Sequence, residues 1–177
     1  MIHAGRYTYG TQNISIEGNE GYSIRFGAFC SIASRCKVWL GGYHRTDWVT
    51  TFPFGHIHQN TFNNFDGQGH PIAKGDILVG NDVWIAADCT LMSGINIGDG
   101  AVIANNSHVI SNVPAYAIYG GNPGKVIKYR FNEEIIKELI ELKWWNFSDY
   151  KINLLTPFLC SKDIEKFIQQ AKKIAKS

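Results

Sequence analysis

The stretch VGNDVWIAADCTLMSGINIGDGAVIANNSHVISNV, residues 79–113, carries an aliphatic residue at every sixth position. These positions are Val79, Ile85, Leu91, Ile97, Ile103 and Val109. The residue four places after each of them is again small or apolar. A period of six fits neither an α-helix nor a simple alternating strand. It is typical of a parallel β-helix, in which three six-residue segments make one coil of eighteen residues.

Coils of this length predict that Val79 lies below Ile97 and Ile85 below Ile103, with backbone groups paired between neighbouring coils. An earlier patch, Phe26, Ile32 and Val38, has the same period. We therefore expect an all-β solenoid, a parallel β-helix of hexapeptide repeats, over residues 1–131.

The period stops between Val38 and Val79, where we expect a loop insertion at about 41–76. Its first part, GGYHRTDWVTTFPFGHIHQNTFNNFDGQGHP, contains four of the six histidines of the chain. A long insertion without a repeat in a regular solenoid is usually functional.

After Ile127 the pattern becomes helical, and we expect a C-terminal helical extension over 132–177. Asn132 can cap a first helix, a second helix should follow Ser161, and an aromatic connector should lie between them. This tail is expected to cover the open end of the solenoid, whose strand edges would otherwise be unpaired.

Charge is unevenly distributed along the 177 residues, which carry a net charge of +2. The 49 residues from Val79 to Ile127 hold four charges, whereas 132–177 hold 15 of 32. Uncharged flat faces predict contacts with other copies of the chain.

The near-neutral net charge of the chain argues against a nucleic-acid partner. The sequence has no apolar run of about 20 residues and no signal-peptide layout at its start. We therefore expect a soluble, cytoplasmic protein without a membrane span.

Three segments of this framework resemble the xenobiotic acetyltransferases: GGYHRTDWVTTFPF at 41–54, GNDVWIA at 80–86 and GGNPGKVIKYRF at 120–131. That family includes chloramphenicol and streptogramin acetyltransferases of the left-handed hexapeptide-repeat superfamily, with many sugar-modifying relatives. The resemblance covers residues 5–145. It implies left-handed coils, a homotrimer with active sites between subunits, and acetyl-CoA as acyl donor.

The resemblance places the family's catalytic base at His44. A histidine that titrates near 6.5 can accept the proton of a hydroxyl as its oxygen attacks a thioester. His44 could also serve only as a hydrogen-bond partner. Asp47 could orient His44 or contact the acceptor, and could equally cap a turn or pair with Arg45. Tyr43 and Trp48 are further candidates for the acceptor pocket, although Trp48 could instead pack the loop against the solenoid.

The donor site is expected along the last coils, where small residues admit a pantetheine arm and basic residues meet phosphate. By resemblance to sugar acetyltransferases of the superfamily, CoA contacts carry over to Ala87, Asn105, Ser111, Lys125 and Lys128. The chain departs from the family pattern at Asn105, which is bulkier, and at Ile110–Ser111, where a threonine–lysine pair is common. Lys125 and Lys128 could also be plain solvent-exposed charges. Trp84 should point outward, into the active-site groove or a subunit contact.

His56, His58 and His70 suggest a zinc site of the γ-class carbonic anhydrase kind, but the histidine-x4-histidine pair of those enzymes is absent. We expect no metal, and histidines that are solvent-exposed or at subunit contacts. No G-x-S-x-G motif is present, and Cys30, Cys36 and Cys89 fall on inward positions where thiols are inert. The sequence predicts direct acetyl transfer to a hydroxyl or amino group of an antibiotic-like molecule, a nucleotide sugar or a surface polysaccharide. A non-catalytic scaffold is the remaining alternative.

Overall fold

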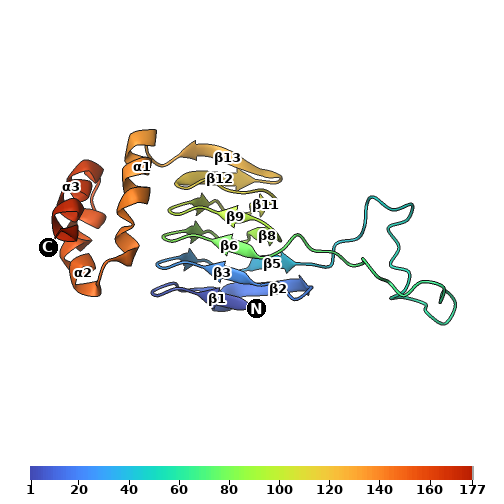
Figure 1. Cartoon of the computed structure of the whole chain (residues 1–177). Coiled ribbons are helices and arrows are strands. Elements are labelled where there is room, and N and C mark those ends of the chain that lie inside the picture. The colour runs from blue at the N-terminus through green and yellow to red at the C-terminus, as the bar shows by residue number, and fades with distance from the viewer. Residues whose placement is uncertain (177) are drawn as a thin grey trace.

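Three β-sheets, parallel except for the last strand β13 (Gly124–Tyr129), form the body of the structure, a computed structural model that describes residues 1–176 (Figure 1). Sheet 1 contains β1 (Ile2–Ala4), β3 (Ile24–Phe26), β6 (Ile77–Val79) and β9 (Asn96–Ile97). Sheet 2 contains β4 (Ser31–Ile32), β7 (Trp84–Ile85), β10 (Val102–Ile103), β12 (Ala117–Gly121) and β13 (Gly124–Tyr129). Sheet 3 contains β2 (Ile14–Asn19), β5 (Cys36–Leu40), β8 (Thr90–Met92) and β11 (His108–Val109).

The strand register confirms the predicted stacking of eighteen-residue coils. Val79 pairs with Ile97, Ile85 with Ile103 and Leu91 with Val109. From β3 to β11 the chain visits the three sheets in a repeating order, so each of these coils contributes one strand to each sheet. Val38 pairs with Leu91 across the insertion, so the stack continues as though the extra residues were absent.

The core of the coils consists of the inward residues that the period of six predicted. Val38, Ile103 and Val109 have no exposed surface. Cys30, Cys36 and Cys89 are buried and free, as expected. Burial raises the pKa of all three thiols, that of Cys89 to about 11, so the reactive thiolate is disfavoured at neutral pH.

The polypeptide after the coils forms α1 (Glu133–Leu142), α2 (Asp149–Leu159) and α3 (Ile164–Ala175), with a short 3₁₀ segment at Trp144–Asn146. A second 3₁₀ segment, Thr11–Asn13, precedes β2 in the first coil. The Asn132 side chain accepts a hydrogen bond from the Ile135 amide, which confirms the predicted cap. The expectation of a connector between two helices is wrong, because α2 occupies it. Ser148 caps α2 by accepting from the Lys151 amide, and Pro157 lies inside its last turn.

The position predicted for the helical tail is also wrong. The helices lie along the corner between sheets 1 and 2, beside the stack rather than across its end (Figure 1). Phe29 and Tyr116 of that corner pack in one apolar cluster with Trp144, and Arg6 donates to the Trp145 carbonyl at 2.8 Å. The edge of the last coil is instead paired by β13, which runs antiparallel to β12. Over residues 1–176, none of the helices is long and apolar enough to cross a membrane.

Candidate active site

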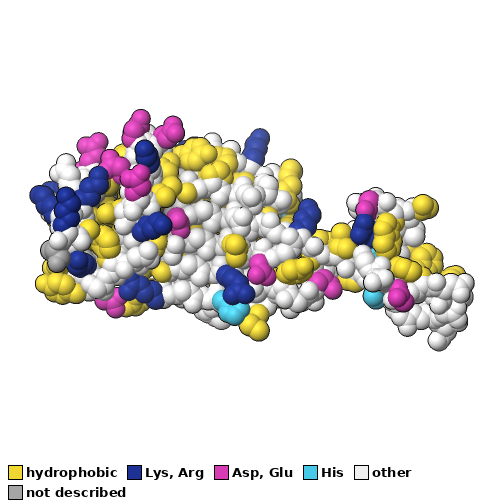
Figure 2. Space-filling view, viewed as in Figure 1, with side chains coloured by type: hydrophobic (Ala, Val, Ile, Leu, Met, Phe, Trp, Pro, Cys, Tyr) yellow, Lys and Arg dark blue, Asp and Glu magenta, His cyan; other side chains and the backbone are white. Residues whose placement is uncertain are grey.

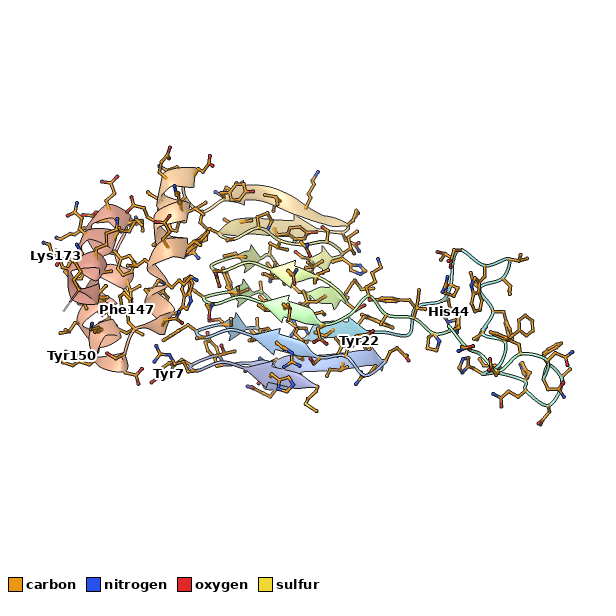
Figure 3. The ribbon with its side chains drawn as sticks, in the orientation of Figure 1. Tyr7, Tyr22, His44, Phe147, Tyr150 and Lys173 are labelled. Atoms are coloured by element: carbon orange, nitrogen blue, oxygen red, sulfur yellow. The ribbon has the colours of Figure 1, made fainter. Side chains whose placement is uncertain are left out.

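The loop of residues 41–76 leaves the stack at the corner between sheets 3 and 1 and projects away from it (Figures 1 and 3). Its neck is closed by an antiparallel bridge between Tyr43 and Ile72, with backbone hydrogen bonds of 3.1 and 3.0 Å. The Tyr43 hydroxyl accepts a hydrogen bond from the buried Ser93 amide at 2.9 Å. These contacts fix the neck to the coil beside it.

His44 lies in this neck, directly after the Tyr43 anchor, and is exposed (Figure 3). Its Nδ1 lies 2.7 Å from the Thr51 carbonyl oxygen. A carbonyl oxygen can only accept a hydrogen bond, so Nδ1 must carry the proton. In the neutral ring Nε2 is therefore unprotonated and able to accept a proton. This is the arrangement that a general base requires.

The remaining loop candidates make contacts that differ in kind. Asp47 pairs with Arg45, whose Nε donates to Oδ1 at 2.7 Å, and this hydrogen bond holds the pKa of Asp47 below its usual value. Arg45 also lies over the Trp48 ring, 5.1 Å from its centroid. Trp48 packs edge-on against Phe65, within the loop rather than against the coils. Any contact of Tyr43, Asp47 or Trp48 with an acceptor stays a prediction.

His70 also lies beside His44, and here the structure corrects an expectation. It is only 6% exposed, whereas His56 and His58 are exposed as predicted. The centroids of the His70 and His44 rings are 4.8 Å apart, with the ring planes at 83°. In the part of the chain that the structure describes, no three His, Cys, Asp or Glu side chains are grouped to hold a metal ion.

Trp84 and Lys128, two candidates for the donor site, share the outer face of sheet 2. Trp84 pairs with Val102, Val102 with Ile118, and Ile118 with Lys128, so these side chains form one column across the sheet. Trp84 is 52% exposed, which confirms that it points outward. The column presents an aromatic ring and a positive charge on the same surface.

The other donor candidates lie at two corners of the stack. Ala87 and Asn105 occupy successive coils at the corner between sheets 2 and 3, where the Asn106 amide donates to the Ala87 carbonyl at 3.1 Å. Ser111 lies at the corner between sheets 3 and 1, with its hydroxyl 3.1 Å from that of Tyr119. Tyr119 donates to the carbonyl of Gly124, the residue before Lys125.

The corner that carries His44 is therefore not the corner that carries Ala87 and Asn105. The width of sheet 3 separates them within one chain, because β5, β8 and β11 lie between the two corners. Sequence reasoning also missed Thr51 and the burial of His70. Thr51 contributes a backbone carbonyl, which every residue type has, so the sequence contains no signal for it.

Comparison with known proteins finds similar acetyltransferases. Residues 76–111 match the family model described as bacterial transferase hexapeptide (six repeats). The chain is 44% identical over 141 residues to a chloramphenicol acetyltransferase of Klebsiella aerogenes, covering 78% of this chain and 66% of the relative. It is 44% identical over 138 residues to a probable macrolide acetyltransferase of Lysinibacillus sphaericus, covering 75% and 74%. A solved hexapeptide-repeat containing acetyltransferase from Vibrio cholerae has a TM-score of 0.53 at 22% identity, covering 74% and 68%.

Stacked six-residue repeats in three parallel sheets define a protein of the bacterial hexapeptide-transferase class. The chain belongs to the xenobiotic acetyltransferase family, as the shared 44% identity with the chloramphenicol and macrolide relatives shows. This confirms the resemblance carried by residues 41–54, 80–86 and 120–131. The chain spans 66% of the length of the chloramphenicol acetyltransferase from Klebsiella aerogenes.

Proposed function

We propose that the chain is an acetyl-CoA-dependent O-acetyltransferase whose active sites form between the subunits of a homotrimer. The observation that carries the proposal is the hydrogen bond from His44 Nδ1 to the Thr51 carbonyl, which leaves Nε2 as the proton acceptor. The names of the chloramphenicol and macrolide relatives support acetyl transfer as the reaction. We also expect left-handed coils, as in the superfamily, and action in the cytoplasm, where the acyl donor is present.

His44 acts as the general base in this proposal. The proton of the acceptor hydroxyl moves to Nε2 as the acceptor oxygen bonds to the acetyl carbon. When the carbon–sulfur bond of the thioester then breaks, His44 Nε2 returns this proton to the CoA sulfur, which leaves as the thiol. The Thr51 carbonyl keeps the ring in the required tautomer and stabilises the imidazolium that forms, because Nδ1–H then donates more strongly. A single positioned base of this kind contributes about 10²- to 10⁴-fold to the rate.

The residues of the outer column and the two corners fit the donor. Acetyl-CoA supplies the activated acetyl group when it is bound. Trp84 and Lys128 would face it from sheet 2, while Ala87, Asn105, Ser111 and Lys125 offer small, polar or basic groups along the last coils. An exposed cation near phosphate gives charge-assisted hydrogen bonds, and a small side chain leaves room for the pantetheine arm.

The positions of the candidate residues in the stack support a trimer with active sites shared between subunits. His44 and the Ala87–Asn105 corner lie on either side of sheet 3, so a second copy would bring these two donor residues to His44, whereas Ser111 lies at the same corner as His44 within one chain. The acceptor is a small molecule with a hydroxyl or amino group, of the antibiotic type by the nature of the relatives. Nucleotide sugars and oligosaccharides are the second group to be tested.

The test is the His44→Ala substitution in the full chain, assayed with labelled acetyl-CoA against chloramphenicol, macrolides, streptogramin A compounds, nucleotide sugars and oligosaccharides. We expect kcat to fall by about 10²-fold or more, with CoA binding unchanged by calorimetry. His58→Ala, which changes an exposed histidine elsewhere in the loop, is the matched control and should keep activity. Near-normal transfer by His44→Ala would refute the base assignment. Failure of the unmodified chain to bind CoA would instead favour a scaffold, and stoichiometric zinc in the purified protein would favour a hydratase.

A further inference from the structure

His70 is a buried polar side chain in a loop whose surface is mostly exposed. Its ring is 6% exposed, and neither Nδ1 nor Nε2 has a hydrogen-bond partner among the described residues. A neutral imidazole carries one N–H donor and one lone pair, so both are removed from water without replacement. Leaving a buried polar group unsatisfied costs about 1–3 kcal/mol. An apolar residue of similar shape would avoid this cost.

The surroundings of His70 hold its ring against His44. The two ring centroids are 4.8 Å apart at an interplanar angle of 83°, which is an edge-to-face contact. The Trp48 ring lies 6.2 Å away and the His56 ring 5.8 Å away. His56 Nε2 lies 2.5 Å from the His70 carbonyl, which fixes the backbone at this point. His70 therefore cannot turn away from His44 without disturbing the loop around it.

An edge-to-face contact between two rings is attractive without a hydrogen bond from a ring nitrogen. Aromatic pairs prefer this arrangement, and an N–H or C–H edge over a ring face is a weak attraction. Burial lowers the pKa of His70, and the positive charges of His44, His56 and Arg45 act in the same direction, opposed by Glu20. The neutral form of the His70 ring is therefore favoured more than in a free histidine.

We propose that His70 is a positioning residue for the general base: packed edge to face against His44, it prevents the half-turn of the His44 ring that would remove Nδ1 from the Thr51 carbonyl. This inference rests on the proposed function of His44. The hydrogen bond to the Thr51 carbonyl selects the Nδ1–H tautomer of His44. The contact with His70 keeps the His44 ring in the orientation in which this hydrogen bond forms. Without His70, the His44 ring would sample orientations in which Nε2 points away from the acceptor.

Two variants separate the ring from its nitrogens. His70→Phe keeps an aromatic edge and discards both nitrogens, whereas His70→Ala removes the packing surface. The readout is the pair of ¹⁵N imidazole chemical shifts of His44, which distinguish the Nδ1–H tautomer from the Nε2–H tautomer, together with kcat and the acetyl-CoA KM. The shifts need no substrate, so they test the positioning of His44 even where no acceptor is known.

We expect the wild type and His70→Phe to show His44 as the Nδ1–H tautomer, and His70→Ala to show a mixture. In His70→Ala, kcat should fall by about ten- to a hundredfold, since small misplacements of a catalytic group have effects of this size. His70→Phe should stay within about threefold of wild type. The acetyl-CoA KM should be unchanged in both, because the proposed donor residues belong to the coils.

Three results would overturn the inference. The first is an unmixed Nδ1–H signal and unchanged kcat in His70→Ala. The second is loss of activity in a folded His70→Phe trimer that keeps the wild-type His44 signal, because the nitrogens of His70 would then take part in the chemistry. The third is a mixture of His44 tautomers in folded His70→Phe. This result can be obtained even if His70→Ala fails to fold. Failure of the proposed function appears separately, as retained transfer in His44→Ala.

Discussion

At the residue scale, the chemistry of the site depends on which groups the ionisable side chains contact. His44 is oriented by the backbone of Thr51 rather than by a carboxylate. Asp47 was the carboxylate that could have taken this role, yet its oxygens are engaged by Arg45. A backbone carbonyl cannot lose or gain a proton at neutral pH, so it defines the tautomer of His44 over the whole working range.

This arrangement predicts a small effect for Asp47→Asn. The substitution removes the charge that pairs with Arg45 and leaves the His44–Thr51 hydrogen bond intact. An exposed ion pair of this kind contributes little, so we expect kcat and the acetyl-CoA KM to stay within about threefold of wild type. Steady-state kinetics will check this, with Asp66→Asn, another exposed loop carboxylate, as control. A hundredfold loss confined to Asp47→Asn would mean that Asp47 orients the base in the active assembly.

At the scale of elements, the loop is a separate piece of structure attached to a rigid stack. Its neck depends on the Tyr43–Ile72 bridge and the hydrogen bond between the Tyr43 hydroxyl and the Ser93 amide. The stack supplies fixed partners for these contacts, because its coils are paired on both sides. Beyond the neck, the loop is held by its own contacts, among them the burial of His70.

The closed loop should lose stability on acidification. The pKa of His70 in the folded loop lies below its ordinary value of 6.5, so an opened loop binds a proton more readily than the closed one. The contribution of neutral His70 to the stability of the closed loop is therefore complete above pH 6.5. This contribution declines as the pH falls from 6.5 toward the lowered pKa of His70 in the closed loop. Amide hydrogen exchange of residues 41–76, compared between about pH 7.5 and 5.5 after correction for intrinsic rates, measures this.

His70→Phe is the control for this experiment, because it keeps the packing and removes the titrating group. The protection of its loop should not decline in the same pH interval. Equal decline in the variant would show that protonation of His70 does not cause the loss of protection.

At the scale of the whole molecule, charges are placed where the protein meets water. Figure 2 shows acidic and basic side chains gathered over the helices, while the visible face of the coils carries few of them. The sequence has the same division, with four charges between Val79 and Ile127 and 15 after residue 131. Exposed apolar side chains on the coils, such as Leu78 and Ile110, are consistent with faces that contact further copies.

A shared active site predicts that two impaired chains can complement each other. His44→Ala lacks the base, and the double variant Lys125→Ala with Lys128→Ala should raise the acetyl-CoA KM by about fivefold or more through lost phosphate contacts. In trimers assembled from an equal mixture, about one interface in four combines an intact base with an intact donor site.

Co-refolded mixtures of the two variants, assayed at subsaturating acetyl-CoA, should therefore gain up to about a quarter of the wild-type rate from the restored interfaces, above the residual rate of the lysine variant. A chain that carries all three substitutions is the control. When it is mixed with the Lys125 and Lys128 variant, the transfer rate should not rise above the residual rate of that variant. Sedimentation analysis establishes the oligomeric state in the same samples. If the co-refolded mixtures are no more active than the two variants assembled separately, the active site is complete within one chain.

The sequence by itself determined the stacked coils, the place of the loop and the N-cap of α1, because these depend on local spacing. Every sixth side chain must point inward for eighteen-residue coils to stack, so the core residues could be read directly from the chain. The residues of 41–54 also pointed to His44. The tertiary structure alone decided the tautomer of His44, the burial of His70 beside it, the helix α2 and the position of the helices along one corner. These features depend on contacts such as His44–Thr51, His44–His70 and Phe29–Trp144, which join residues that no period relates.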